Sequence, residues 1–288
     1  RFSLESGKAK ELFGFGKWVL GSSILIFLIT HGDDIFVGRL LGATMLGFYQ
    51  MAYRISNMPA TEITHVISQV TFPAYSKLQD NIPKLREAYL KVLQVTAFLS
   101  FPIAGLIFVL APDFTKIFLG EKWMPMVPAM QILVLAGLVR SIAATTGPIF
   151  HAVGKPKIDT KLQIIRLFLL VALICPFIVK WNLRGASAVV LISIFISTFG
   201  FCFKAIKITK CNVKEFVKTI LFPLVNATLM ILVILLLKTI LDTGIWEFII
   251  FTCAGILVHF IIAYLTDRFL NYKIQAHIKE SLRLLRCV

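Results

Sequence analysis

The sequence predicts an all-α polytopic membrane protein, a helix bundle with eight transmembrane helices. Of its 288 residues, 58% are hydrophobic and 16% are charged, and the mean hydropathy is +0.84. Soluble domains do not combine such values, whereas long apolar runs are typical of membrane spans. Eight runs reach the roughly 20 residues that a span needs. They cover 13–41, 44–75, 85–110, 125–153, 158–179, 185–208, 216–241 and 245–266.

The basic residues are unevenly distributed among the segments that join these spans. A net charge of +15 could indicate a nucleic-acid-binding protein, but the positive-inside rule explains it better. Five alternate segments contain 22 of the 30 Lys and Arg residues, and the four segments between them contain 6. The basic segments are 1–17, 74–94, 151–166, 204–218 and 266–288. We therefore expect both chain ends in the cytoplasm and no nucleic-acid partner.

The first two spans are long and partly polar. An ionised group at the bilayer centre costs roughly 2.5–3.5 kcal/mol or more unless it faces water or a partner. In the second span, polar residues recur every three to four positions and so form one stripe. The stripe consists of Arg54, Met58, Thr61, His65 and Ser68, flanked by Asn57, Glu62 and Gln69. We expect it to face a water-filled cavity between helices.

Arg54 and Arg140 are the candidate anion-binding residues. Arg140 lies near the middle of the fourth span. Arginine stays charged at physiological pH and binds phosphate oxygens with two donors at once. Two arginines in one wet cavity would attract an anionic headgroup such as a pyrophosphate, with Asn57 and Thr61 as further substrate contacts. The alternative is internal ion pairing, for instance of Arg54 with Asp34 or Glu62.

A second set of residues could bind a coupling ion or a proton, as carboxylates and histidines in membrane bundles often do. The set comprises Asp33, Asp34, Glu62 and His65. The alternatives are a salt bridge with Arg54 or simple hydration, and for Asp33 solvation at the outer mouth. His259, in the last span, is expected to be an ordinary helix histidine whose hydrogen bonds are satisfied.

The remaining spans are apolar and joined by short connections. The segment GEKWMPMVP predicts a turn followed by a helix start at Pro125 or Pro128. Segments 180–184 and 242–244 are predicted turns. Beyond the last span, residues 268–288 form an amphipathic, basic pattern. That pattern predicts a helix on the anionic inner leaflet, with a solvated helix packed on loops as the alternative.

Enzyme chemistry finds no support in the sequence. It contains no G-x-S-x-G, H-E-x-x-H or P-loop motif. The five cysteines match no zinc spacing, and none falls in a predicted outer segment, so no disulfide is expected. We therefore expect no enzyme, no cofactor and no metal.

Several stretches resemble the polysaccharide flippases of bacterial envelopes. They are DDIFVGRLLGATMLGFYQMAYRISNMP, VTFPAYSKLQD, FLGEKWMPMVPAMQILVLAGLVRSI and AVGKPK. The similarity runs from the first residues to about residue 210. It is to the colanic-acid and lipopolysaccharide type of oligosaccharide transporter, in the multidrug/oligosaccharidyl-lipid/polysaccharide exporter superfamily.

This resemblance implies two six-helix lobes followed by two extra helices. Residues 1–212 would form the second lobe, and residues 213–288 two further transmembrane helices and a basic amphipathic cytoplasmic tail. The start at Arg1, without Met and inside a basic polar segment, agrees with a piece of a longer protein.

The resemblance also implies a function. Such a protein would move undecaprenyl-pyrophosphate-linked oligosaccharide units across the bacterial cytoplasmic (inner) membrane by alternating access. Relatives line a cationic cavity with arginines, and we assign that role to Arg54 and Arg140. The implied partners are a lipid-linked oligosaccharide, membrane lipids and a polysaccharide polymerase or export complex.

Two other functional classes are alternatives to a flippase. A cation-coupled multidrug exporter of the same superfamily would favour carboxylates over arginine, and Asp34 and Glu62 leave it open. A membrane glycosyltransferase or ligase would need a large outer loop that carries catalytic residues. The predicted outer loops are too short for that class.

Overall fold

The computed structural model describes residues 6–242 and 244–270, without the side chains of 6–13, 15, 59–60, 62–70, 267 and 269–270. The described residues form helices and no strands, which confirms the all-α class. The helices are α1 Ser6–Leu41, α2 Ala43–Leu78, α3 Ile82–Phe114, α4 Val127–Ala152, α5 Pro156–Thr209, α6 Val213–Lys238 and α7 Ile245–Leu270. Two short pieces, η1 Thr115–Leu119 and η2 Glu121–Met126, join α3 to α4. The predicted tail helix falls outside the described residues.

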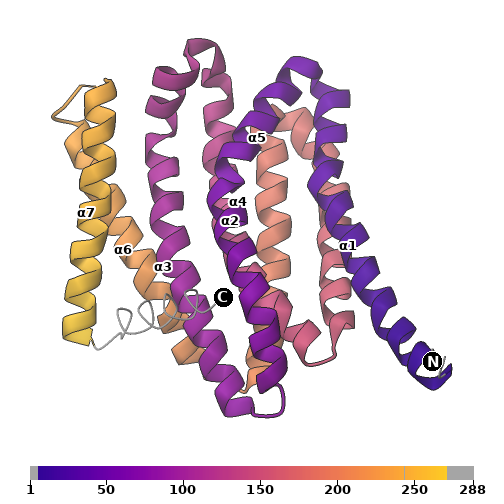
Figure 1. The fold of residues 1–288 in the computed structure, drawn as a ribbon. Helices are drawn as coiled ribbons and strands as arrows, with labels where there is room; N and C mark the ends of the chain where they lie inside the picture. Colours follow the sequence, from indigo (N-terminus) through magenta and orange to yellow (C-terminus); the bar gives the residue numbers. More distant parts are fainter. Residues whose placement is uncertain (1–5, 243, 271–288) are drawn as a thin grey trace, which may run out of the picture.

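Helix α5 is two antiparallel helices joined at a sharp reversal (Figure 1). The reversal lies at Asn182, with φ 50° and ψ −132°, inside the predicted turn 180–184. A Cβ atom at Gly185 would lie 2.0 Å from the carbonyl oxygen of Phe177, so only glycine fits this close approach. Further along, Gly200 lies against Leu162. The predicted fifth and sixth spans are thereby confirmed.

Five helical stretches are long and apolar enough to cross a membrane. They are Ile82–Leu119, Glu121–Ala152, Pro156–Thr209, Val213–Lys238 and Ile245–Thr266. Because the third one reverses at Asn182, these five supply six rods. The 36-residue helices α1 and α2 supply the other two and run along the same bundle (Figure 1). Both carry charged residues, as expected from their sequences. The structure therefore contains the eight predicted helical rods.

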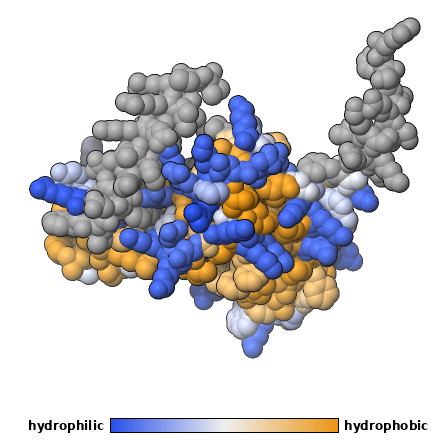
Figure 2. All heavy atoms as spheres, turned by 90° about the horizontal axis from the view of Figure 1, so that it is seen from below, coloured by the Kyte–Doolittle hydropathy of each residue, from blue (hydrophilic) through white to orange (hydrophobic). Residues whose placement is uncertain are grey.

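The connections alternate between the two ends of the bundle. The turns after α2, after α4 and after α5 lie at the lower end in Figure 1, where α1 also begins. The reversal of α5 and the connection between α6 and α7 lie at the upper end. Figure 2 looks at the lower face and shows many hydrophilic side chains there, with hydrophobic surface at the flanks. The connections within the basic segments 74–94, 151–166 and 204–218 therefore lie at the opposite end from the less basic connections.

The core is formed where α2, α4 and α5 pack together, with α1 against α5. Met130 and Leu133 of α4 and Ile174 and Ile178 of α5 are fully buried there. Helix α6 packs chiefly on α3, and α7 lies at the flank beyond it (Figure 1). The division into a lobe and two added helices stays a prediction.

Candidate functional site

A polar network lies at mid-depth between α2 and α4. Arg140 is the fourteenth of the 26 residues of α4, so it lies roughly 20 Å along the axis from the helix start. Its Nη2 donates a hydrogen bond of 2.8 Å to the hydroxyl oxygen of Tyr53. The guanidinium carbon lies 5.4 Å from the centroid of the Tyr53 ring. The buried Nε has no hydrogen-bond partner among the described residues.

The network continues to α1 through a second tyrosine. The ring of Tyr49, one turn before Tyr53, lies 6.1 Å from the Tyr53 ring. The Tyr49 hydroxyl donates to Oδ2 of Asp33 at 2.6 Å, and both residues are buried. The expectation that Asp33 is solvated at the outer mouth is therefore wrong: packing of α1 on α2 covers the carboxylate, and the tyrosine replaces water as its donor.

Arg166 is a functional candidate that the sequence reasoning missed. It was counted with the basic segment 151–166, yet it is the eleventh residue of α5, roughly 15 Å along the axis from the helix start. Its charge interacts with those of Arg140 and Asp33. Its buried Nε also has no partner among the described residues. The sequence could have indicated this depth, because Arg166 comes ten residues after Pro156, the first residue of α5.

The described residues of the predicted stripe on α2 are uncovered in this chain. Arg54, Met58 and Thr61 are all exposed, so this face does not point into the bundle formed by the described residues. Thr61 donates to the carbonyl oxygen of Asn57 at 3.0 Å. The opposite face of α2 is buried, and Ser56 donates to the carbonyl oxygen of Met130 at 2.8 Å.

The remaining predicted residues have different surroundings. Asn57 is buried, its Nδ2 donates to the carbonyl oxygen of Tyr53 at 3.0 Å, and its Oδ1 has no described partner. Asp34 accepts a hydrogen bond of 3.0 Å from Gln50. No ion pair joins Asp34 to Arg54 within the part of the chain described, and the alternative pairing of Arg54 with Glu62 stays untested. The side chains of Glu62 and His65 lie outside the described residues.

His259 differs from its prediction. It is buried, and its ring centroid lies 4.7 Å from that of Phe98 on α3. Neither ring nitrogen has a hydrogen-bond partner among the residues that the structure describes. The ring instead packs between the aromatic side chains of Phe98 and Phe260 where α7 meets α3.

Comparison with known proteins places this arrangement in context. A family model described as "Polysaccharide biosynthesis protein" matches residues 1–128. The chain is 32% identical over 177 residues to the lipopolysaccharide biosynthesis protein WzxC of Escherichia coli (strain K12), which covers 62% of this chain and 35% of that protein. It is 33% identical over 147 residues to the teichuronic acid biosynthesis protein TuaB of Bacillus subtilis (strain 168), which covers 51% of this chain and 30% of that protein.

A solved structure shares the fold. The lipid II flippase MurJ, in an inward closed conformation, superposes with a TM-score of 0.73 at 20% identity. The match covers 86% of this chain and 52% of that chain. The chain spans about half or less of the length of the curated relatives it matches. The resemblance found in the sequence is confirmed. The chain is similar to proteins of polysaccharide biosynthesis and shares the fold of a lipid II flippase.

Proposed function

We propose that the chain forms part of a flippase for undecaprenyl-pyrophosphate-linked oligosaccharide repeat units. The flippase moves these units from the cytoplasmic to the periplasmic leaflet by alternating access, in exopolysaccharide, O-antigen or capsule biosynthesis. The names of the relatives support a role in polysaccharide biosynthesis, and the fold of MurJ supports lipid flipping. The observation that carries the proposal is the pair Arg140 and Arg166 at mid-depth.

These two arginines suit a pyrophosphate for an electrostatic reason. Each has a buried Nε without a hydrogen-bond partner in the described part of the chain, and their charges repel each other. Placing cations in a membrane bundle is costly unless an anion or water compensates. A pyrophosphate brings negative charge to both and accepts from both guanidinium forks. Asp33 supplies part of the compensation when no substrate is bound.

The exposed face of α2 supplies the second wall of the same site. Arg54 and Thr61 lie on that face, and we assign them to substrate contact. Asn57 offers an acceptor, its unpartnered Oδ1, that suits a sugar hydroxyl. The polyprenyl tail stays in lipid while the headgroup crosses. A second lobe facing this surface would rock around the bound headgroup.

The orientation follows from charge. The connections within the basic segments 74–94, 151–166 and 204–218 lie at one end of the bundle, and the positive-inside rule assigns that end to the cytoplasm. This orientation places both ends of the chain on the cytoplasmic side of the inner membrane. A polysaccharide polymerase or export complex is the proposed partner, since such a complex consumes the transported unit.

The test uses the full-length gene in its host. A deletion strain is complemented with wild type, Arg140→Gln, Arg166→Gln or Arg184→Gln, an exposed arginine in the α5 reversal that serves as the matched control. Lipid-linked oligosaccharide is then quantified in each leaflet. A hydrogen bond to a charged group contributes about 1.5–3 kcal/mol, so Arg140→Gln and Arg166→Gln should each lose roughly tenfold or more of the transport rate. Wild-type export by both of these variants would refute the cationic site.

A cation-coupled multidrug exporter is the second candidate, and the buried carboxylate of Asp33 favours it. Such an exporter would move cationic drugs in exchange for a proton or an ion bound at the carboxylate. Drug susceptibility of the deletion strain separates the two functions. Normal leaflet distribution of lipid-linked sugar together with raised drug sensitivity would support the exporter.

A further inference from the structure

A groove with a volume of about 680 Å³ lies at the lower end of α1 and α5, at the helix ends rather than at mid-span. Four lysines line it: Lys155, Lys157, Lys161 and Lys204. Trp18 of α1 forms part of the wall, and Nζ of Lys157 lies 5.2 Å from the centroid of its ring. We call this site the basic groove.

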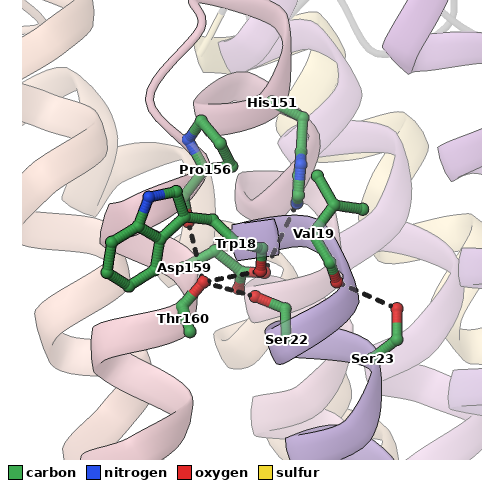
Figure 3. Close-up of polar contacts among 8 residues, drawn as sticks. All are labelled: Trp18, Val19, Ser22, Ser23, His151, Pro156, Asp159 and Thr160. Atoms are coloured by element: carbon green, nitrogen blue, oxygen red, sulfur yellow. Dashed lines mark hydrogen bonds and ion pairs between the residues drawn. The ribbon is translucent and has the colours of Figure 1, made fainter. Parts of the chain in front are cut away.

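The basic groove is held together by contacts between α1 and α5 (Figure 3). Thr160 Oγ1 donates a hydrogen bond of 2.8 Å to the carbonyl oxygen of Trp18 and lies 2.9 Å from Ser22 Oγ. A Cβ atom at Gly21 would be 3.4 Å from the Thr160 methyl group, so the two helices approach closely here. The positions of Trp18 and of the lysines on α5 are therefore set by the packing of two helices.

The described lining of the groove contains lysines and no acidic side chain. Asp159 is the carboxylate nearest to them in sequence, but it is buried and its Oδ2 lies 3.3 Å from His151 Nε2 of α4. Figure 3 shows Asp159 directed toward His151, and the Trp18 indole lies on the side of Asp159 that faces away from His151. None of the described residues that line the groove is acidic. The described lining thus gathers positive charge without a counterion among its own residues.

The surface beside the basic groove, on the side of the membrane centre, is apolar. Ile165 lines the groove and is exposed, and Phe168 follows it one turn later with 71% of its surface exposed. On the second half of α5, Phe203 is exposed next to Lys204. On α1, Leu20 and Ile24 are exposed two and six residues beyond Trp18. Along the membrane normal, the charged groove at the helix ends is therefore followed by apolar surface toward the membrane centre.

We propose that the basic groove binds the phosphate headgroup of an anionic membrane lipid. The lysines would bind the phosphate, while the acyl chains lie on the exposed apolar side chains of α1 and α5. Trp18 sits where the two meet, a position that tryptophan favours at membrane interfaces. A soluble anion would use the lysines but leave the adjoining apolar surface without a role, so the arrangement favours a lipid. The site is separate from the mid-span arginines.

The test measures lipid binding to the purified full-length protein in detergent, by native mass spectrometry, with phosphatidylglycerol as the probe. The variant is Lys157→Gln/Lys161→Gln. The matched control, Lys77→Gln/Lys84→Gln, removes two exposed lysines at the same end of the bundle but outside the groove. A lysine near an anionic surface is worth roughly a fivefold factor in affinity. The groove variant should therefore lose roughly tenfold or more, and the control should keep wild-type affinity.

A second measurement tests whether the bound lipid lies next to Trp18. Brominated phosphatidylglycerol should quench part of the tryptophan fluorescence of the wild type, and Trp18→Phe should remove that part. Equal losses in the groove variant and the control, or no loss in either, would overturn the proposal. So would equally tight binding of phosphatidylcholine. Displacement of phosphatidylglycerol by millimolar inorganic phosphate would indicate a soluble-anion site instead. These measurements need no transport, so their failure is distinct from failure of the flippase proposal.

Discussion

The guanidinium group of Arg140 on α4 donates to the phenol oxygen of Tyr53 on α2 at 2.8 Å. The same two residues also make a cation–π contact, with 5.4 Å between the guanidinium carbon and the ring centroid. Tyr53 therefore fixes where the charge of Arg140 lies between the helices. The neighbouring pair, Tyr49 and Asp33, ties the same part of α2 to α1.

Tyr53→Phe should weaken transport without abolishing it. The substitution removes the hydrogen bond to Arg140 but keeps the aromatic face, so the charge stays in the site with a looser position. We expect a fall of roughly three- to tenfold in the export of lipid-linked sugar, less than for Arg140→Gln. The measurement is leaflet-resolved quantification of that lipid in complemented deletion strains. Tyr264→Phe, an exposed tyrosine on α7, is the control, and equal effects of the two would contradict the role of Tyr53.

Asp33→Ala should destabilise the protein. It leaves the Tyr49 hydroxyl, which is fully buried, without its acceptor. An unsatisfied buried polar group costs about 1–3 kcal/mol. We expect a lower thermal midpoint of the full-length protein in detergent, and Asp33→Asn should recover much of the loss because its amide oxygen can still accept. Asp242→Ala, an exposed acidic residue, should leave the midpoint unchanged.

Gly185→Ala should prevent the reversal of α5. The added methyl group would lie 2.0 Å from the carbonyl oxygen of Phe177, a backbone atom that has no room to move away. Costs above about 4 kcal/mol are exceptional for single substitutions, and this one should reach them. Protein in the membrane fraction, detected by immunoblot, should fall sharply. Gly147→Ala, which meets nothing within 4 Å, should accumulate normally, and equal levels of the two variants would refute the close approach.

Lys238→Ala should loosen α6 from α3. The ammonium group of Lys238 forms a largely buried ion pair with Asp113 of α3. Removing one partner of a buried pair costs about 3–5 kcal/mol, whereas replacing both by apolar residues can be neutral. Thermal unfolding should therefore show a larger loss for Lys238→Ala than for Asp113→Leu/Lys238→Leu. A larger loss for the double variant would show that the pair itself holds α6.

The orientation of the bundle can be checked by chemical labelling. In a cysteine-free background, Lys122→Cys places a thiol at the less basic end and Lys155→Cys places one at the basic end, both at exposed positions. A membrane-impermeant maleimide added to intact spheroplasts should label the first and spare the second until the membrane is permeabilised. The reverse pattern would invert the proposed topology.

The sequence by itself determined how many helical rods the bundle contains and where the chain reverses between them. Apolar runs bounded by polar connections specify spans because the backbone must satisfy its hydrogen bonds within each helix. This is why the turns at 180–184 and before Pro128 lie where they were predicted. It also determined the depth of Arg140, since the rise per residue is constant.

Only the tertiary structure decided which side chains meet. Position along a helix predicts depth, but rotation about the axis depends on which neighbours the helix packs against. The close contacts of α1 with α5, and of α1 with α2, bury Asp33 and give it Tyr49 as a donor. The same packing brings Arg166 close enough for its charge to interact with that of Arg140, and it leaves Arg54 exposed. The proposed arginine pair therefore consists of Arg140 and Arg166, a residue that the charge count had included in the basic segment 151–166.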